Sequence, residues 1–320
     1  MKDTILFGDC RETLKNLTNS SARMCVTSPP YYGLRDYGGE KNQIGQEESP
    51  EEYVKQMVEV FRLVRDVLTD DGTLWLNIGD SYYNYRSDGN YPKQTVSKTR
   101  QDLPQSTPVR GNKLKGLKSK DLIGIPWMLA FALRADGWYL RQDIIWHKPN
   151  PMPESVQDRC TKAHEYIFLL SKSKNYFYDN EAIKEPAKDW GTRDRTNGKY
   201  HNPGSGLAPH SGLTKSYATK NKRSVWSVTK KPYKGAHFAV FPPELIEPCI
   251  KAGSEVGDTI LDPFMGSGTS AMVAKSLGRY YTGCELHEEY GNLIQERIQD
   301  YHPVNEVAQE PTINILDLIQ

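Results

Sequence analysis

One of two short motifs that could do chemistry is residues 27–32 (TSPPYY), which follow a short apolar run. The two prolines have no N–H groups and a fixed backbone, so their carbonyl groups are rigid and available as hydrogen-bond acceptors. The Ser28 hydroxyl is a further acceptor, and Tyr31 presents an aromatic face. This pattern favours a site for a planar group that bears an amine, although a proline-rich turn that merely ends a strand would explain the motif if it stood alone.

The second motif is a glycine-rich turn, residues 262–269 (DPFMGSGT), between a predicted strand and a predicted helix. Such a turn lets a ligand approach the backbone at a helix N-terminus. Glu285 ends the next predicted strand, where a carboxylate can accept both hydroxyl groups of a ribose. The absence of GxGxxG and GxxxxGK[ST] disfavours a dinucleotide or a nucleoside triphosphate. A structural glycine turn is the competing interpretation, and the position of Glu285 disfavours it.

Predicted strands and helices alternate around these motifs. The predicted strands are residues 5–7, 24–27, 73–78, 139–146, 259–261 and 280–284, and the predicted helices are residues 11–17, 50–68, 122–135, 243–252, 269–277 and 287–301. Ser49 is the expected N-cap of the longest helix, with Pro50 at its first position. Residues 164–170 and 176–178 are expected to form a hairpin. The alternation predicts an α/β fold, a largely parallel sheet with helices on both faces.

The charge of the chain is unevenly distributed, although its net charge is only +1. Residues 86–120 carry nine Lys and Arg against two Asp, and residues 184–234 carry twelve against three acids, so the remainder is acidic. Aromatic residues lie among these cations, which favours a nucleic-acid partner over two solvated loops. We expect one domain over residues 1–320 with two basic insertions, residues 82–120 and 181–234.

Composition excludes several classes of protein. No run approaches the roughly 18 apolar residues of a membrane-spanning helix, and six Trp and 19 Tyr argue against wholesale disorder. The five cysteines are scattered and form no CxxC pair, so neither a disulfide framework nor a metal site is expected. The first ten residues lack the apolar core of a signal peptide. We therefore expect a cytoplasmic protein without a membrane partner.

Together, the two motifs resemble those of the amino-group DNA methyltransferases that use S-adenosylmethionine. Residues 28–31 match the catalytic motif [DNS]PP[YFW] of that family, and residues 262–269 match its cofactor motif DPFxGSGT. Their order along the chain resembles that of the circularly permuted beta group. Four further segments resemble parts of the family: residues 7–10, 72–80, 146–155 and 236–242. The resemblance implies a Rossmann-like methyltransferase fold with a mostly parallel sheet of seven strands.

The resemblance also implies transfer of a methyl group from S-adenosylmethionine to an exocyclic amine of a base flipped out of double-stranded DNA. The implied catalytic residues are Ser28, Pro29, Pro30 and Tyr31. The implied cofactor-binding residues are Asp9, Cys10, Asp262, Phe264, Gly266, Ser267, Gly268, Thr269 and Glu285. The resemblance further implies one catalytic domain with a DNA-contacting loop at 82–120 and a target-recognition region at 181–234, in a bacterial, archaeal or phage-infected cell. The cations expected to contact DNA are Lys113, Lys115, Lys148, Arg193, Arg195, Lys220 and Arg223.

Several alternatives stay open at this point. In the family, Ser at the first catalytic position favours N4 of cytosine, and N6 of adenine is the alternative. Cytosine C5 chemistry uses a Cys after Pro, but Cys249 follows Pro248 within a helical pattern and is expected to be buried. A DNA-binding protein without activity would leave both motifs unused. The target sequence, a cognate restriction endonuclease and a homodimer are not decided by the sequence.

Overall fold

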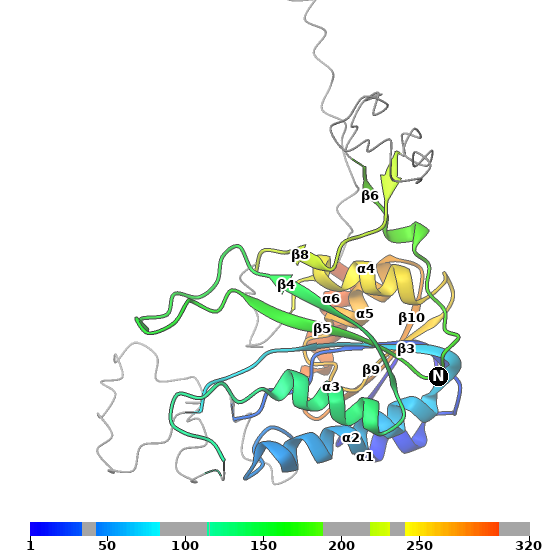
Figure 1. Ribbon diagram of the computed structural model, residues 1–320. Coiled ribbons are helices and arrows are strands. Elements are labelled where there is room, and N and C mark those ends of the chain that lie inside the picture. Colours follow the sequence, from blue (N-terminus) through cyan, green and yellow to red (C-terminus); the bar gives the residue numbers. More distant parts are fainter. Residues whose placement is uncertain (34–42, 84–113, 115, 188–217, 231–240, 301–320) are drawn as a thin grey trace, which may run out of the picture.

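The computed structural model describes residues 1–33, 43–83, 114, 116–187, 218–230 and 241–300 (Figure 1). In chain order, the elements are β1 (Thr4–Phe7), α1 (Cys10–Thr13), η1 (Leu14–Asn16), β2 (Ala22–Thr27), α2 (Pro50–Val67), β3 (Leu68–Ile78), α3 (Ile125–Ala135), β4 (Tyr139–His147), β5 (His164–Ser171), η2 (Glu181–Ile183), β6 (Glu185–Pro186), β7 (Thr219–Lys220), β8 (Val225–Ser227), α4 (Pro243–Gly253), β9 (Thr259–Asp262), α5 (Thr269–Ser276), β10 (Tyr280–Glu285) and α6 (Tyr290–Asp300). Among the described residues, no helix is long and apolar enough to cross a membrane.

One sheet organises the protein, with the strand order β1-β10-β9-β2-β3-β5-β4-β8. The strands β1, β10, β9, β2 and β3 each run parallel to their neighbours in this order, whereas β5 is antiparallel to both β3 and β4. The predicted, mostly parallel sheet is confirmed. An eighth strand, β8, which comes from the second insertion, adds three residues to the edge beside β4. A separate small sheet joins β6 and β7 in the same insertion.

The predicted hairpin between residues 164–170 and 176–178 is wrong. Both edges of β5 are already paired, one with β3 and one with β4, so it has no edge left for residues 176–178. These residues instead pack beside the sheet: the backbone N–H of Phe177 donates to the Asp71 carbonyl over 2.9 Å, and Tyr178 stacks on Trp75.

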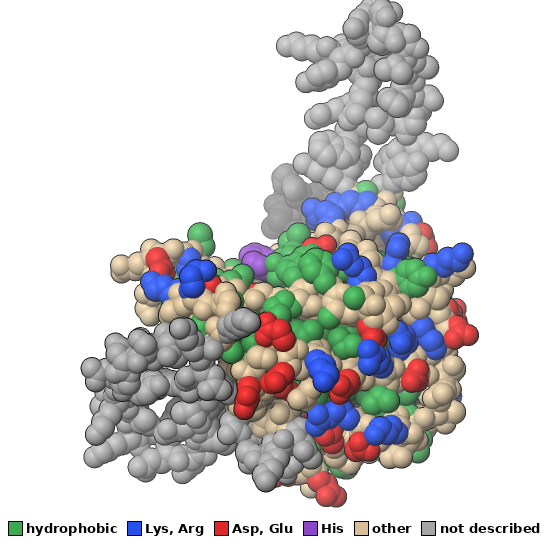
Figure 2. Space-filling model, turned by 60° about the horizontal axis from the view of Figure 1, so that its bottom comes forward, with side chains coloured by type: hydrophobic (Ala, Val, Ile, Leu, Met, Phe, Trp, Pro, Cys, Tyr) green, Lys and Arg blue, Asp and Glu red, His purple; other side chains and the backbone are tan. Residues whose placement is uncertain are grey.

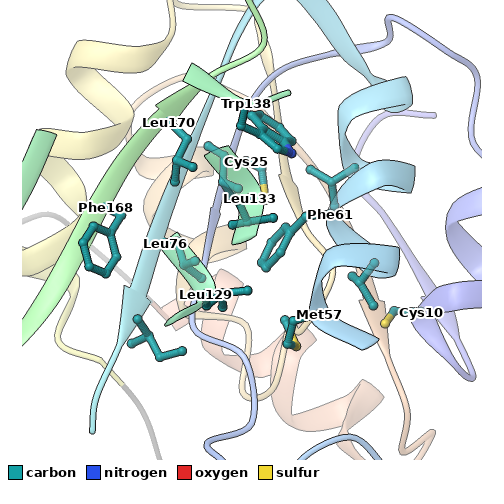
Figure 3. Close-up of a cluster of buried hydrophobic side chains, with 14 of the residues drawn as sticks. Cys10, Cys25, Met57, Phe61, Leu76, Leu129, Leu133, Trp138, Phe168 and Leu170 are labelled. Atoms are coloured by element: carbon teal, nitrogen blue, oxygen red, sulfur yellow. The ribbon is translucent and has the colours of Figure 1, made fainter. Parts of the chain in front are cut away.

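Helices cover both faces of the sheet, with α1, α2 and α3 on one face and α4, α5 and α6 on the other (Figure 1). Successive side chains of β2 point to opposite faces of the sheet, so this strand contributes to two cores. Cys25 packs in the core beneath α1, α2 and α3, whereas Met24 and Val26 pack in the core beneath α4, α5 and α6. Figure 3 shows the first core, where Phe61 of α2 and Leu129 of α3 point towards the sheet.

The sequence of α2 explains where this long helix begins and which side it buries. The Ser49 hydroxyl caps the helix by accepting the backbone N–H of Glu52 over 3.2 Å, and Pro50 occupies the first turn, as predicted. Met57, Phe61 and other apolar residues at helical spacing are buried against the sheet. The helix thereby fixes β2 and β3 as neighbours, since it connects them.

The carboxyl ends of five neighbouring parallel strands, β1, β10, β9, β2 and β3, lie at one edge of the sheet. From β9, the chain passes through α5 to β10, whereas from β2 it passes through α2, on the opposite face, to β3. Strand order therefore reverses between β9 and β2. In open α/β sheets, a ligand binds in the crevice at such a reversal. Both chemical motifs follow these two strands, because residues 28–31 continue β2 and residues 263–268 continue β9.

Candidate active site

The catalytic turn, residues 28–31, is held from both sides. The Tyr53 hydroxyl of α2 donates to the Pro30 carbonyl over 2.8 Å, and the Tyr31 hydroxyl donates to Oε2 of Glu165 in β5 over 2.8 Å. Pro29 is buried and Ser28 is partly exposed. Within the part of the chain that the structure describes, no donor is assigned to the Pro29 carbonyl. The turn therefore offers the Ser28 hydroxyl and the Pro29 carbonyl to a ligand.

Tyr31 lies in a tight, largely apolar setting. Burial raises the pKa of Tyr31 well above its ordinary value, and the nearby Glu165 carboxylate raises it further, against the effect of a hydrogen bond from Ser28. A Cβ atom on Gly79, just after β3, would lie 2.7 Å from Cε2 of Tyr31. Because real Cβ atoms do not approach so closely, glycine at this position makes room for the ring. Tyr31 is thus a neutral phenol with little freedom to move.

Asp262 is buried at the end of β9 and is fully engaged inside the protein. Its Oδ1 accepts the Thr27 hydroxyl over 2.6 Å and the Phe264 N–H over 3.0 Å, and its Oδ2 accepts the Ser270 hydroxyl over 2.5 Å. Burial raises the pKa of Asp262 to about 6, although these hydrogen bonds act to lower it. The carboxylate therefore shapes the glycine turn from within, and a direct contact with a cofactor is not what this geometry favours.

Glu285, at the end of β10, is placed differently. Its Oε2 accepts the Gly266 N–H over 2.7 Å, and its Oε1 accepts the His287 N–H over 3.0 Å. Each carboxylate oxygen has a second lone pair, so both can still accept a hydrogen bond from a ligand. Burial raises the pKa of Glu285, and this rise is partly offset by hydrogen bonds from the two backbone N–H groups and by the charge of His287. The side chain is fixed in one orientation beside the glycine turn.

The glycine turn depends on the absence of side chains at its tightest points. Gly268 has φ +79°, and a Cβ there would lie 2.5 Å from Cγ2 of Ile294 in α6. Ser267 and Thr269 are buried, and Ser267 accepts a hydrogen bond from Arg297 of α6. Their side chains anchor the turn to α6 and to the start of α5, which leaves the backbone as the surface that a ligand could approach.

The segment after β1 lies beside Glu285, because the Gly8 N–H donates to the Glu285 carbonyl over 2.8 Å. Asp9 caps α1 and pairs with Arg11 over 2.5 Å. Burial acts to raise the pKa of Asp9, but the hydrogen bonds and charge of Arg11 outweigh it and lower the pKa. Cys10 is buried, and burial raises the pKa of its thiol. Their side chains are thus structural, and the backbone of this segment faces the crevice edge.

Comparison with known proteins matches residues 22–296 to the DNA methylase family of N6 and N4 methyltransferases. The chain belongs to this family. It is 48% identical to the Type II methyltransferase M.SmaI of Serratia marcescens, covering 92% of this chain and 90% of that protein, and 47% identical to M.XycI of Xanthomonas campestris pv. cyanopsidis, covering 92% and 87%. It is therefore a DNA methyltransferase whose methyl donor is S-adenosylmethionine.

Solved structures with the same fold support the architecture. PvuII DNA methyltransferase (cytosine-N4-specific) superposes with a TM-score of 0.61 at 18% identity, covering 96% of this chain and 89% of that one. A DNA modification methylase of Thermus thermophilus complexed with S-adenosyl-L-methionine gives a TM-score of 0.57 at 23% identity, covering 92% of both chains. The predicted Rossmann-like methyltransferase fold is confirmed.

The residues at the strand ends fit S-adenosylmethionine, which carries a cationic sulfonium group, a ribose and no phosphate. Glu285 offers two carboxylate oxygens to ribose hydroxyls beside the glycine turn. The buried Nε2 atom of His287 has no hydrogen-bond partner among the described residues, so a polar ligand atom could satisfy it. No group of His, Cys, Asp or Glu that could hold a metal ion occurs in the described ranges.

The cations that were expected to contact DNA lie in different settings, one buried and two at the base of the second insertion. Lys148 is buried and pairs with Glu165, and burial lowers its pKa, so its position does not match a phosphate contact. Lys220 and the exposed Arg223 lie at the base of the second insertion, where both pair with Glu185. The remaining expected contacts lie outside the described residues: Lys113, Lys115, Arg193 and Arg195.

Three residues of the site carried no recognisable signal in the sequence. Glu165 and Tyr53 each hold the catalytic turn through a side chain that lies outside both motifs, and Thr27 lies in the first motif but gave no sign that it bonds Asp262 of the second. Such partners depend on strand order, which one sequence does not reveal. Cys249, by contrast, is confirmed as a buried residue of α4, and burial raises the pKa of its thiol. A role as a cytosine C5 nucleophile is therefore not supported.

Proposed function

We propose that this protein is a cytosine-N4-specific DNA methyltransferase that acts on a base flipped out of double-stranded DNA. The observation that carries the proposal is the Ser28 hydroxyl beside the Pro29 carbonyl at the end of β2. The hydroxyl is a neutral acceptor, which suffices for one hydrogen of an amino group. N6 of adenine is the alternative, because its exocyclic amine has the same hydrogen-bonding pattern.

In the proposed mechanism, the catalytic turn orients a weak nucleophile, because the lone pair of an exocyclic amine is conjugated with its ring. Hydrogen bonds from the amine to the Ser28 hydroxyl and the Pro29 carbonyl draw the nitrogen towards tetrahedral geometry. Tyr31 provides the face on which the flipped base stacks. Bound S-adenosylmethionine supplies an electrophilic methyl group. The contribution of the turn is orientation and electrostatics, and no strong base is required since the proton can leave after transfer.

The cofactor site is proposed to use the crevice between β9 and β2. Glu285 accepts the ribose hydroxyls, and the backbone of residues 264–269 lies against the cofactor. Asp262 acts indirectly, by fixing the turn. We further propose that the two insertions, residues 82–120 and 181–234, contact the DNA and that the second reads the target sequence. A cognate restriction endonuclease is proposed as a functional partner, and a homodimer as one form of the enzyme.

The test is to express the protein in cells without other DNA methyltransferases and to analyse their DNA. Mass spectrometry of the nucleosides should show N4-methylcytosine, and modification-resolved sequencing should show one recurring site. N6-methyladenine in place of N4-methylcytosine would support the alternative and refute the base assignment. Ser28→Ala should abolish the modification while S-adenosylmethionine binding is retained, and full modification by that variant would overturn the role of the turn.

A further inference from the structure

A buried ion pair lies behind the catalytic turn. Lys148, just after β4, pairs with Oε1 of Glu165 in β5, and the two side chains are only 7% and 17% exposed. The desolvation of two charges is costly, so such a pair is weak support for stability by itself. The Lys148 ammonium lies 4.3 Å from the centroid of the Trp146 ring, which places the cation against β4. Neither charge is needed to form the sheet, because the backbone pairing of β4 with β5 does not depend on them.

The second oxygen of this carboxylate faces the catalytic turn. Glu165 Oε2 accepts the Tyr31 hydroxyl over 2.8 Å, so one carboxylate joins Lys148 to the aromatic residue of the turn. A Cβ on Gly79 would lie 2.7 Å from Cε2 of Tyr31 and 3.2 Å from Cδ of Glu165. The ring and the carboxylate therefore both rest on the backbone of residue 79. The edge of the ring is held by the strand end and its hydroxyl by the carboxylate.

We propose that Glu165, paired with Lys148, is a positioning residue that fixes the direction of the Tyr31 ring axis for stacking on the flipped base. The proposal rests on the proposed function, in which Tyr31 stacks on that base. The phenolic oxygen lies on the axis of rotation about χ2, so a hydrogen bond from the hydroxyl to an anchored carboxylate fixes the direction of the ring axis. The close approach of Cε2 to the backbone of residue 79 restricts rotation of the ring about that axis. Lys148 anchors the carboxylate by balancing its charge in a buried place.

The experiment compares Tyr31→Phe, Glu165→Gln and Lys148→Met with the parent enzyme on a duplex that contains the mapped target site. Turnover should fall about 10- to 100-fold, because small misplacements of a reacting group carry costs of this size. Calorimetry should show unchanged affinity for S-adenosylmethionine, since none of the three residues contacts the glycine turn. The matched control is Glu247→Gln, which breaks the partly exposed pair of Glu247 with Lys251 on α4 and should leave turnover unchanged.

Stacking is measured with 2-aminopurine at the target position, from the share of the short fluorescence lifetime that a stacked base produces. That share should decrease in Tyr31→Phe and in Glu165→Gln, whereas a loss of fold stability alone would not change it in the folded fraction. The double variant Tyr31→Phe/Glu165→Gln should turn over no more slowly than the slower single variant, within about twofold, because Glu165 has no hydrogen bond to Tyr31 left to lose once the hydroxyl is absent.

The inference would be overturned if Tyr31→Phe and Glu165→Gln kept the turnover and the fluorescence lifetimes of the parent enzyme. It would also be overturned if the fold-losses in turnover of the two single variants multiplied in the double variant. If Glu165→Gln fails to fold with Lys148 unpaired, Tyr31→Phe and Lys148→Met decide together, because Tyr31→Phe also removes the hydrogen bond with Ser28, whereas Lys148→Met leaves it in place. Tyr31→Ala separates this inference from the proposed function. An inactive Tyr31→Ala beside a fully active Tyr31→Phe refutes only the positioning role, whereas a fully active Tyr31→Ala refutes the role of the turn itself.

Discussion

The Thr27 hydroxyl donates a hydrogen bond to the Asp262 carboxylate over 2.6 Å, across 235 residues of sequence. Both side chains are buried at the carboxyl ends of neighbouring strands, β2 and β9. Thr27 directly precedes Ser28, and Asp262 opens the glycine turn. The bond therefore joins the catalytic turn to the glycine turn at the position where the strand order of the sheet reverses, so that the two turns keep a fixed separation.

Thr27→Val tests this connection, since it keeps the shape of the side chain and removes the hydroxyl. Asp262 would lose one of three donors, and the free energy of unfolding should fall by about 1–3 kcal/mol, the usual cost of an unsatisfied buried group. Turnover should fall as well, because the two turns are no longer tied together. Thr27→Ser, which retains the hydroxyl, is the control. Denaturant unfolding and turnover both at parental values in Thr27→Val would contradict the connection.

The raised pKa of Asp262 predicts a pH dependence of stability. Its pKa is about 6 in the folded protein against an ordinary 3.8, so the folded state holds the proton more tightly than the unfolded state. The stabilisation of the neutral acid is complete below about pH 4 and is lost as pH rises to about 6. The change is on the order of 3 kcal/mol. Above that window, the contribution of this group is constant.

Asp262→Asn cannot titrate and isolates this contribution from those of other groups. Denaturant unfolding of the parent and the variant should be compared from pH 4 to pH 7. The parent should lose stability relative to the variant as pH rises through the window. A difference that stays constant, or that grows in favour of the parent, would show that Asp262 does not carry a raised pKa.

Glu285→Gln should weaken binding of S-adenosylmethionine about 10- to 100-fold, because a charge-assisted hydrogen bond contributes about 1.5–3 kcal/mol. The substituted amide would also turn a donor towards the Gly266 or the His287 N–H, each of which the carboxylate accepts. Glu288→Gln, an exposed acid three residues further on, is the matched control. Unchanged cofactor affinity in calorimetry would refute the ribose role of Glu285.

The limits of sequence reading follow from the kind of contact involved. The end of β2, the glycine turn and Glu285 follow from local patterns, because strand ends, helix starts and glycine turns are encoded over a few residues. The partners of these residues are not local. Glu165 reaches Tyr31 only because β5 runs antiparallel between β3 and β4, and the predicted hairpin at residues 176–178 failed for the same reason.

Burial was equally hard to predict from the sequence. A lysine in the WHKPN segment of a DNA methyltransferase favours a phosphate contact, yet Lys148 is buried and a carboxylate from β5 faces it. Asp262 has the residue type and position of a cofactor ligand, but both of its oxygens are occupied by Thr27, Phe264 and Ser270. Residue type and spacing thus predicted a site, while tertiary contacts decide which side chains face it.

Gly79→Ala should impair turnover without weakening the binding of S-adenosylmethionine. The added Cβ would lie 2.7 Å from Cε2 of Tyr31 and would push the ring out of its place, whereas the cofactor turn lies across β2 on β9. Turnover should fall about 100-fold if the ring moves by about 1 Å. Gly291→Ala is a useful comparison, since its Cβ would meet only the partly exposed Phe7 ring, at 3.0 Å. Normal turnover in Gly79→Ala would show that the position of the ring is unimportant.

The base of the second insertion presents a cluster of cations around one acid. Arg223 Nε lies 3.1 Å from the Glu185 carboxylate, and the Lys220 and Lys222 ammonium groups each lie 3.9 Å from it. Three cations on one carboxylate leave a local excess of positive charge, and the Arg223 side chain is 74% exposed. On the face that carries α1 to α3, by contrast, Figure 2 shows acidic and basic side chains intermixed. The cluster is thus better suited to phosphates than that face is.

Lys220→Ala combined with Arg223→Ala should therefore weaken DNA binding on all sequences. Removal of each phosphate-binding cation should reduce the slope of log affinity against log salt by about 0.9, because fewer counterions are released. The parent, with about six to ten such cations over both insertions, should lose roughly 10³–10⁵ in affinity between 50 and 200 mM salt. Lys251→Ala, a lysine of α4 that pairs with Glu247, is the matched control. Fluorescence anisotropy over a salt series measures the slopes. A double variant with the parental slope would place the phosphate contacts elsewhere in the insertions, most directly in residues 86–120.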